Sequence, residues 1–177
     1  MSTMTEAEIF ESVTGSGSTD FAALVAILNR HGRWCLIGGL AVNCYVEPVY
    51  TVDADVVVSA AELASIKQDL TKSGFSTEEF PHSLNAQMAG SNLRIQMTLD
   101  DRYQGFVQDA TARQVLGQTV PVASLANLIQ GKVWALQDSQ RRPTKRKKDE
   151  LDLMRILEAY PETRHLMPEE IKQQVPE

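Results

Sequence analysis

The sequence lacks three features that mark specialised classes of protein. No apolar run approaches the roughly 20 residues that cross a bilayer, which predicts that no segment spans a membrane. The N-terminal segment, MSTMTEAEIFESV, is acidic and lacks the basic and apolar regions of a secretory signal. The two cysteines are too few for a disulfide framework and do not have the paired spacing of zinc ligands. We therefore expect a cytoplasmic protein in which Cys35 and Cys44 are packing residues.

The composition is that of an ordinary globular domain, with 43% hydrophobic and 23% charged residues. The net charge of −6 is unevenly distributed, because the segment RRPTKRKK at 141–148 holds six of the 17 basic residues. Without that segment the balance is 11 − 23 = −12, which is not typical of a general nucleic-acid binder. The basic segment is either a solvated loop between two helices or a local landing site for phosphates.

Hydrophobic periodicity and turn residues predict an alternation of helices and strands. Strands are expected at 34–37, 51–59 and 113–122, the last as a pair around Gly117, with two or three more between 75 and 99 that turn at 89–92. Helices are expected at 6–13, at 21–31 after a cap at Thr19 or Asp20, at 40–47, at 61–73 after a cap at Ser59, at 125–139 and at 148–160, with a short turn after Pro168.

This pattern predicts an α/β (α+β) fold with a helical tail. The expected organisation has three parts: an N-terminal helix and flexible joint at 1–18, a core at 19–122, and a C-terminal helical region at 123–177 packed on that core.

The segment IGGLAVNCYVEPVYTVDADVVV carries the clearest chemical signal. Gly38 and Gly39 stand at a predicted strand-to-helix turn, where glycine lets backbone N–H groups approach a triphosphate. After 13 further residues comes Asp53-x-Asp55, whose side chains share one face of a strand because strand side chains alternate. Two carboxylates on an otherwise apolar strand form an oxygen site suited to Mg²⁺ or Mn²⁺ bound to phosphates.

Three charged residues lie on the apolar stripes of the two long C-terminal helices. Lys132 falls on the stripe of the helix at 125–139, and Asp149 and Asp152 extend the stripe of the following helix. A charge on such a stripe has to pair with an opposite charge or face a cleft. Two alternatives follow: a buried ion pair of Lys132 with Asp149 or Asp152, or a functional role for all three.

The order of these motifs resembles the nucleotidyltransferase superfamily, which includes DNA polymerase β and the small MNT proteins. The matching residues are Ile37-Gly38-Gly39 and Asp53-x-Asp55. The segments VPVASLANLIQGKVWALQ and KKDELDLMRILEAYP resemble the AbiEii branch, toxins of type IV toxin–antitoxin systems, so the resemblance covers roughly residues 34–161. It implies a polymerase β-like sheet, Mg²⁺ or Mn²⁺ on Asp53 and Asp55, and an NTP that contacts Gly38, Gly39 and Lys132.

The resemblance also implies an activity, the transfer of an NMP group from an NTP to a hydroxyl. Asp149, or else Asp152, would position or deprotonate that hydroxyl, which could belong to a tRNA, a protein or a small molecule. The basic segment at 141–148 favours a nucleic acid, and an antitoxin protein is an implied partner.

One position departs from the superfamily pattern. The strand LRIQMT carries Gln96 where a third carboxylate is expected, and Asp100 lies roughly 13 Å farther along the strand. Arg94, on the same strand, is either a surface residue or a phosphate contact. An amide is a weaker Mg²⁺ ligand than a carboxylate. Either a C-terminal aspartate supplies the missing charge, as the AbiEii resemblance permits, or the alternative function holds, a catalytically weak binding or regulatory protein of the same fold.

Overall fold

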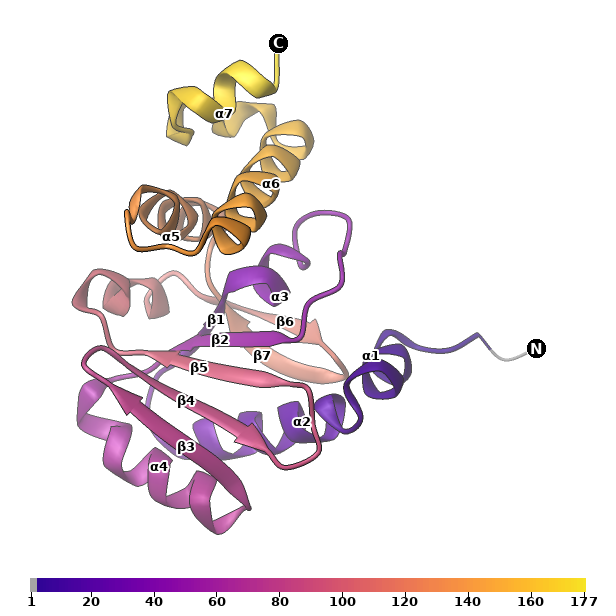
Figure 1. Ribbon diagram of the computed structural model, residues 1–177, viewed down its shortest axis with the longest axis vertical. Helices are drawn as coiled ribbons and strands as arrows, with labels where there is room; N and C mark the ends of the chain where they lie inside the picture. Colours follow the sequence, from indigo (N-terminus) through magenta and orange to yellow (C-terminus); the bar gives the residue numbers. More distant parts are fainter. Residues whose placement is uncertain (1–2) are drawn as a thin grey trace.

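A seven-stranded sheet runs through the centre of the computed structural model, which describes residues 3–177 (Figure 1). The strand order is β3-β4-β5-β2-β1-β7-β6. β2 pairs in parallel with β5, and β1 in parallel with β7, while the other pairs are antiparallel. The strands are β1 (Cys35–Ile37), β2 (Asp53–Val57), β3 (Phe75–Phe80), β4 (Ser83–Met88), β5 (Arg94–Thr98), β6 (Thr111–Val115) and β7 (Gln118–Val122).

Helices cover both faces of the sheet (Figure 1). α2 and α4 lie against one face, here called the lower face, and α3, α5 and α6 lie over the opposite, upper face, with α7 packed against α6 farther from the sheet. The helices are α1 (Glu6–Thr14), α2 (Gly17–Leu28), α3 (Gly38–Val42), α4 (Leu63–Lys72), α5 (Leu125–Gln137), α6 (Pro143–Ala159) and α7 (Glu169–Gln174), with short 3₁₀ turns η1 (Ala60–Glu62), η2 (Asp101–Val107) and η3 (Pro161–Leu166).

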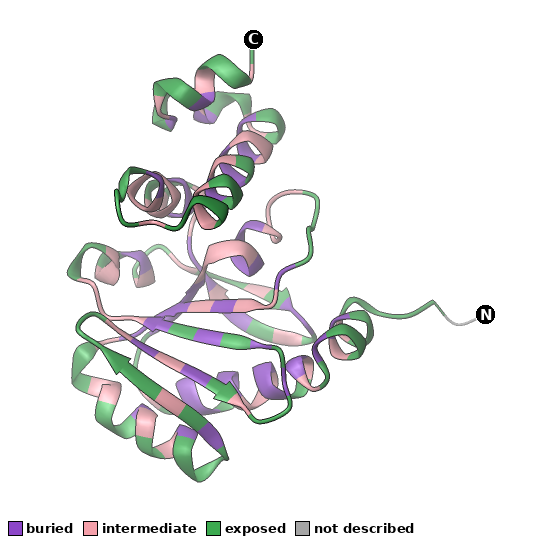
Figure 2. Cartoon of the chain, viewed as in Figure 1, coloured by how far each residue is buried: buried purple, intermediate pink, exposed green. Residues whose placement is uncertain are grey.

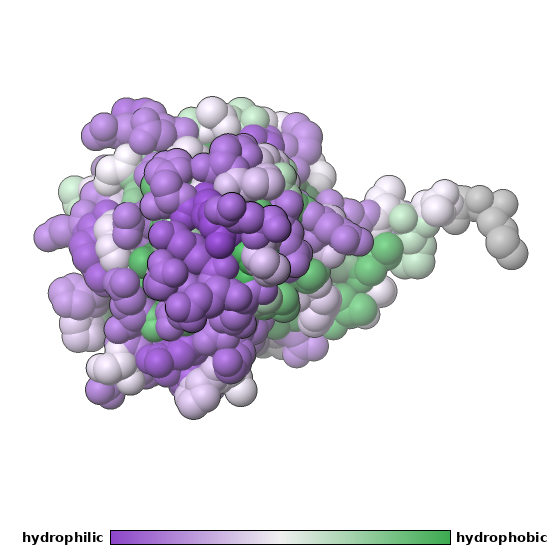
Figure 3. All heavy atoms as spheres, turned by 90° about the horizontal axis from the view of Figure 1, so that it is seen from above, coloured by the Kyte–Doolittle hydropathy of each residue, from purple (hydrophilic) through white to green (hydrophobic). Residues whose placement is uncertain are grey.

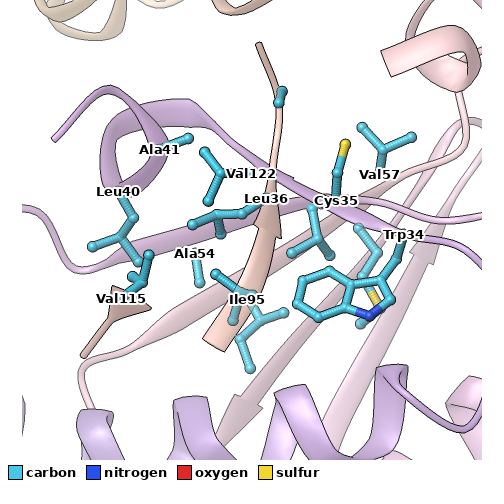
Figure 4. Close-up of a cluster of buried hydrophobic side chains, with 14 of the residues drawn as sticks. Trp34, Cys35, Leu36, Leu40, Ala41, Ala54, Val57, Ile95, Val115 and Val122 are labelled. Atoms are coloured by element: carbon cyan, nitrogen blue, oxygen red, sulfur yellow. The ribbon is translucent and has the colours of Figure 1, made fainter. Parts of the chain in front are cut away.

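The apolar core lies mainly between the sheet and the lower helices. Alternation along the central strands sends Ala54, Val56 and Ile95 into this layer, and each is at most 1% exposed. Figure 4 shows part of the core, where side chains of β1, β2, β5, β6 and β7 meet those of α3. The upper sides of β2–β5 carry polar residues instead, and Figure 2 shows the resulting mixture of buried and exposed positions along these strands.

The predicted strands are confirmed. The stretch from 75 to 99 forms three strands with a turn at residues 89–90, the pair around Gly117 forms β6 and β7, and Ser59 accepts a hydrogen bond from the Ala61 N–H as a cap. The α/β class is also as predicted. None of the helices within residues 3–177 combines the length and apolar character needed to cross a membrane.

The second helix begins earlier than predicted, at Gly17 rather than after Thr19 or Asp20. A tight turn, built on the buried side chain of Thr14, starts it. The Thr14 hydroxyl donates to the Phe10 carbonyl and accepts from the Gly17 N–H, while the Glu11 carboxylate accepts from the N–H groups of Ser18 and Thr19. The side chain of Glu11 therefore satisfies N–H groups of the first helical turn that a capping residue would otherwise bind.

Candidate active site

Asp53 and Asp55 project from the upper face of β2. Asp53 lies opposite Arg94 of β5 in the parallel register, and Asp55 lies opposite Gln96. Both aspartates are partly buried, whereas Ala54 between them is fully buried in the lower layer. The alternation of β2 thus presents two carboxylates on one side of a central strand.

The side chain of Asp55 leaves no room for a side chain at Gly38. β1 runs antiparallel to β2, with Ile37 opposite Asp55, and the chain turns directly afterwards at Gly38 with φ +71°. A Cβ atom at Gly38 would collide with a carboxylate oxygen of Asp55 and lie 3.0 Å from its Cβ. At Gly39 a Cβ would make an ordinary 3.5 Å contact with Thr51. Of the two glycines, Gly38 is therefore the one that both the positive φ angle and the lack of space for a side chain require.

The helix after these glycines is shorter than predicted. α3 spans Gly38–Val42 rather than 40–47, and turns follow it. The Asn43 side chain donates to the carbonyl of Val49 and accepts from its N–H, which ties down a loop in place of further helical turns. This loop returns the chain to β2 and brings Asp53 and Asp55 beside Gly38.

Two cations hold the Asp53 carboxylate. Lys145 Nζ lies 2.8 Å from Oδ2, and Arg94 Nε lies 2.8 Å from Oδ1. Burial raises the pKa of Asp53, but the hydrogen bond and charge of Lys145 and the charge of Arg94 outweigh it, so the net effect lowers the pKa. Asp53 is therefore an ionised group whose charge is already balanced by the protein.

Asp55 is in the opposite situation. Burial, reinforced by the neighbouring charge of Asp53, raises the pKa of Asp55 to about 6. The cations of Lys132, Lys145 and Arg141 lower the pKa only in part, and within residues 3–177 none of them forms an ion pair with Asp55. A partly buried carboxylate without a paired cation favours the arrival of an external positive charge.

Lys132, Asp149 and Asp152 meet between α5 and α6. Lys132 Nζ lies 3.0 Å from Asp149 Oδ1 and 2.7 Å from Asp152 Oδ2. Arg141 pairs with Asp149 at 2.9 Å, and Arg155 pairs with Asp152 at 2.8 Å. Burial lowers the pKa of Lys132, but the two carboxylates more than offset this and raise it. The ion-pair alternative is thus present in the structure, and Asp149 orients Lys132 and Arg141.

Most of the basic segment 141–148 is helical, so the alternative of a solvated loop between two helices is wrong for residues 143–148. α6 begins at Pro143, a residue that favours the first helical position, so residues 143–148 form its first turns. Arg141 and Lys145 reach the two acidic centres, Arg146 donates to the Asp138 carbonyl, and Lys147 pairs with Glu150. Three of the six basic residues of this segment are therefore paired with carboxylates within the chain. Figure 3 shows the strongly hydrophilic surface over these C-terminal helices.

Two cavities meet at the carboxylates. The first cavity, of about 610 Å³, is lined by Gly38, Lys132, Arg141 and Asp149 and extends to aromatic residues of η2 and α5. The second cavity, of about 370 Å³, lies over the open upper face of β3–β5 and is lined by Asp53 and Lys145. Asp55 and Gln96 line both cavities. Two molecules bound in these cavities would therefore approach each other at Asp55.

Comparison with solved structures agrees with this architecture. No family model matches the sequence, and a search of curated proteins gives no match. Among solved structures, ANT(2'')-Ia in complex with adenylyl-2''-tobramycin is similar with a TM-score of 0.59 and 13% identity, over 90% of this chain and 98% of that one. The fold is that of the nucleotidyltransferases.

Two further structures support the nucleotidyltransferase fold. The lincosamide antibiotic adenylyltransferase LnuA, with lincomycin bound, has a TM-score of 0.52 and 12% identity over 77% of this chain and 94% of that one. JHP933 from Helicobacter pylori has a TM-score of 0.52 and 15% identity over 98% of this chain and 74% of that one. The AbiEii branch, expected from the C-terminal segments, stays a prediction.

In this nucleotidyltransferase fold Gln96 takes the in-register position beside Asp55. Among residues 3–177 no three acidic, histidine or cysteine side chains are grouped to hold a metal ion. Asp100 does not supply a third carboxylate, because it caps η2 and binds the Arg102 guanidinium. A metal here would have two carboxylates and draw its other ligands from elsewhere.

Sequence reasoning missed the cations that reach Asp53 and Asp149, namely Lys145 and Arg141. A signal was present, since Lys145 and Asp149 are four residues apart and Asp149 and Asp152 are three apart, which puts all three on one helical face. Taking Pro143 as the first helical residue would have extended the helix back to include Lys145.

Proposed function

We propose that the protein is a Mg²⁺-dependent nucleotidyltransferase that moves an NMP group from an NTP to a hydroxyl acceptor. The observation that carries this proposal is that Asp55 lines both cavities. A donor in the first cavity and an acceptor in the second would react beside the same carboxylate, with no movement of the sheet.

The residues beside Asp55 fit a divalent cation, Mg²⁺ or Mn²⁺. Mg²⁺ commonly takes one or two carboxylates and completes its shell with water and phosphate oxygens, which matches the pair Asp53 and Asp55. Burial and the neighbouring charge of Asp53 raise the pKa of Asp55, and a bound cation would oppose both effects. When bound, the ion would neutralise charge on the transferred phosphoryl group.

The first cavity suits the phosphates of the nucleotide. Gly38 has no side chain, and its turn brings backbone close to Asp55. Lys132 and Arg141 line the same cavity and are held in fixed positions by Asp149, so they would attract phosphate oxygens without being reordered. Asp149 is a positioning residue in this arrangement, and Asp152 supports Lys132 from the other side.

The second cavity suits a small polyhydroxylated acceptor. Glu78, Asn85 and Gln96 lie in register across β3, β4 and β5 beside Asp55, and all line this cavity. The Oδ1 atom of Asn85 is buried without a hydrogen-bond partner within residues 3–177, so it is available to accept from a hydroxyl or amine. Two structures with a similar fold hold antibiotic ligands, adenylyl-2''-tobramycin in ANT(2'')-Ia and lincomycin in LnuA.

The AbiEii resemblance implies a different acceptor, a tRNA or a protein. With that acceptor the protein would be a toxin and would have an antitoxin partner. Its original support was the basic segment, whose Arg141, Lys145 and Lys147 are ion-paired within the chain. A small-molecule acceptor is therefore favoured. If expression of the protein arrested growth and the assay labelled tRNA, the tRNA acceptor would be favoured instead.

The test is an assay with α-labelled NTPs, Mg²⁺, and tobramycin, lincomycin or total tRNA as acceptor. Label should appear in an acceptor with the wild-type protein and disappear with Asp53→Asn, which loses a ligand charge. Asp69→Asn, on α4 on the opposite side of the sheet, is the matched control and should keep the activity. Transfer that survives Asp53→Asn would contradict the proposed site.

A second function, nucleotide binding without appreciable catalysis, is favoured by Gln96 and by the two cations that already occupy Asp53. Gln96→Asp restores a third carboxylate in register with Asp55. A gain in transfer rate with this variant, from a wild type that binds NTP but labels no acceptor, would identify the protein as a weakened member of the fold.

Lys145→Ala is expected to tighten Mn²⁺ binding by about fivefold in the absence of nucleotide, since a partly exposed ion pair is worth up to about 1 kcal/mol. Lys145 Nζ lies 2.8 Å from Asp53 Oδ2 and competes with an incoming ion for that oxygen. Mn²⁺ titration followed by electron paramagnetic resonance measures the change. Lys147→Ala, on the same helix but paired with Glu150, should leave the affinity unchanged.

A further inference from the structure

The far end of the first cavity is built from an ordered aromatic stack. Phe106 of η2 and Trp134 of α5 stack with ring centroids 5.9 Å apart and an angle of 14°. Tyr103 packs edge-on against both rings, at 5.1 and 5.2 Å. All three residues line the cavity.

Gly131 brings η2 and α5 into this close contact. A Cβ at Gly131 would lie 3.1 Å from the Tyr103 ring and 3.5 Å from Phe106. The Tyr103 hydroxyl also lies 3.4 Å from the Gly131 carbonyl oxygen. The position of Trp134 relative to η2 is therefore set by packing of helix backbone against aromatic rings.

Arg102 adds a planar cation to the stack. Its guanidinium carbon lies 5.2 Å from the centroid of the Trp134 ring. Asp100 accepts hydrogen bonds from Arg102 Nε at 3.1 Å and from a terminal nitrogen of the same guanidinium at 2.8 Å. These two bonds fix the orientation of the guanidinium plane. Phe106, Trp134 and Arg102 follow one another in this stack, and Arg102 is its outermost member. Because 57% of the Arg102 side chain is exposed, the guanidinium is accessible to a ligand.

The two ends of the first cavity differ in charge. Lys132 and Arg141 line the end beside Gly38 and Asp55, where phosphates are attracted. At the other end the charge of Arg102 is balanced by Asp100, and Asp138 adds a further carboxylate nearby, so this end carries no excess positive charge to attract a triphosphate. A ligand with a polyanionic tail and a neutral planar head matches this distribution.

Resting on the nucleotidyltransferase function proposed above, we propose that Arg102, held on Trp134 by Asp100, is the platform on which the base of the NTP stacks. Guanidinium planes stack on nucleobases, and such stacking depends little on which base is present. All four NTPs should therefore bind, with purines somewhat tighter than pyrimidines because their rings cover more of the platform.

The test compares ATP with inorganic tripolyphosphate, both with Mg²⁺, by isothermal titration calorimetry. Arg102→Lys keeps the positive charge and removes the planar fork. It should weaken ATP binding by about tenfold, within the range found when a base-stacking partner is lost, and leave tripolyphosphate binding nearly unchanged. Arg33→Lys, an exposed arginine outside both cavities, is the matched control and should alter neither affinity.

Each outcome decides a different point. If Arg102→Lys binds ATP as tightly as the wild type, or weakens ATP and tripolyphosphate equally, base stacking on Arg102 is wrong while nucleotide binding stands. If the wild-type protein binds neither ligand, the nucleotidyltransferase proposal itself fails, and the platform fails with it. Unchanged thermal melting of Arg102→Lys shows that the variant is folded, which its exposed position favours.

Discussion

Asp55→Asn is expected to abolish nucleotidyl transfer and, at the same time, to stabilise the metal-free protein. The loss of activity follows because Asp55 is the carboxylate that both cavities share, and removing its charge should cost at least about 10²- to 10³-fold in rate. The transfer assay with labelled NTP measures this loss. Full activity in Asp55→Asn would remove Asp55 from the reaction.

The gain in stability follows from the direction of the pKa shift. The pKa of Asp55 rises from an ordinary value of 3.8 to about 6 in the folded protein, because burial disfavours the charged form. The unfolded chain therefore releases this proton more readily, and ionisation destabilises the fold fully above the folded pKa. The cost, up to about 3 kcal/mol, is relieved as the pH falls from 7 through 6 towards 4.

Urea unfolding at pH 5 and pH 7.5, with a chelator present, measures this effect. The wild type should gain free energy of unfolding at the lower pH relative to Asp55→Asn, which lacks the titrating group and should be the more stable protein at pH 7.5. Asp53→Asn is the matched control with the opposite sign, since it leaves Lys145 and Arg94 without their shared partner and should destabilise. Equal stability of both variants at pH 7.5 would contradict the electrostatic assignment.

Gly38→Ala is expected to destabilise the protein by about 2–4 kcal/mol, whereas Gly39→Ala should be neutral or slightly stabilising. Gly38 has φ +71°, a strained conformation for alanine, and its Cβ would displace the Asp55 carboxylate. Gly39 lies within α3 and offers ordinary contact distances, so alanine there should gain about 0.5–1 kcal/mol of helix propensity. Urea unfolding measures both.

The same pair of variants separates two roles of the glycines. Because Gly38→Ala moves Asp55, it should also reduce transfer strongly in any fraction that remains folded. Gly39→Ala leaves Asp55 in place, so any loss of activity there would report direct contact of Gly39 with the nucleotide. A Gly38→Ala protein as stable as the wild type would mean that Asp55 can shift without cost, against the close packing described above.

Local patterns in the sequence predicted most of the fold. Alternation along 51–59 and 94–98 marked the upper and lower faces of β2 and β5, and the turn residues near Gly90 and Gly117 marked the hairpins. Helix ends were less accurate, and each error has a local cause. Asn43 ties a loop that shortens α3, Glu11 satisfies N–H groups at the start of α2, and Pro143 starts α6 five residues before the predicted helix.

The sequence also predicted part of the candidate site, and only the tertiary structure determined the rest. The sequence predicted that Asp53 and Asp55 share a strand face after Gly38. It also predicted that Lys132, Asp149 and Asp152 face inward, because periodicity determines which side chains share a face. The opposite electrostatic states of Asp53 and Asp55 could not be predicted from the sequence, although both are aspartates and only Ala54 separates them. Asp53 pairs with Lys145, 92 residues away in the chain, while no cation of the described residues 3–177 pairs with Asp55. Charge interactions depend on distance in space and on burial, and only the packing of α6 over β2 determines both.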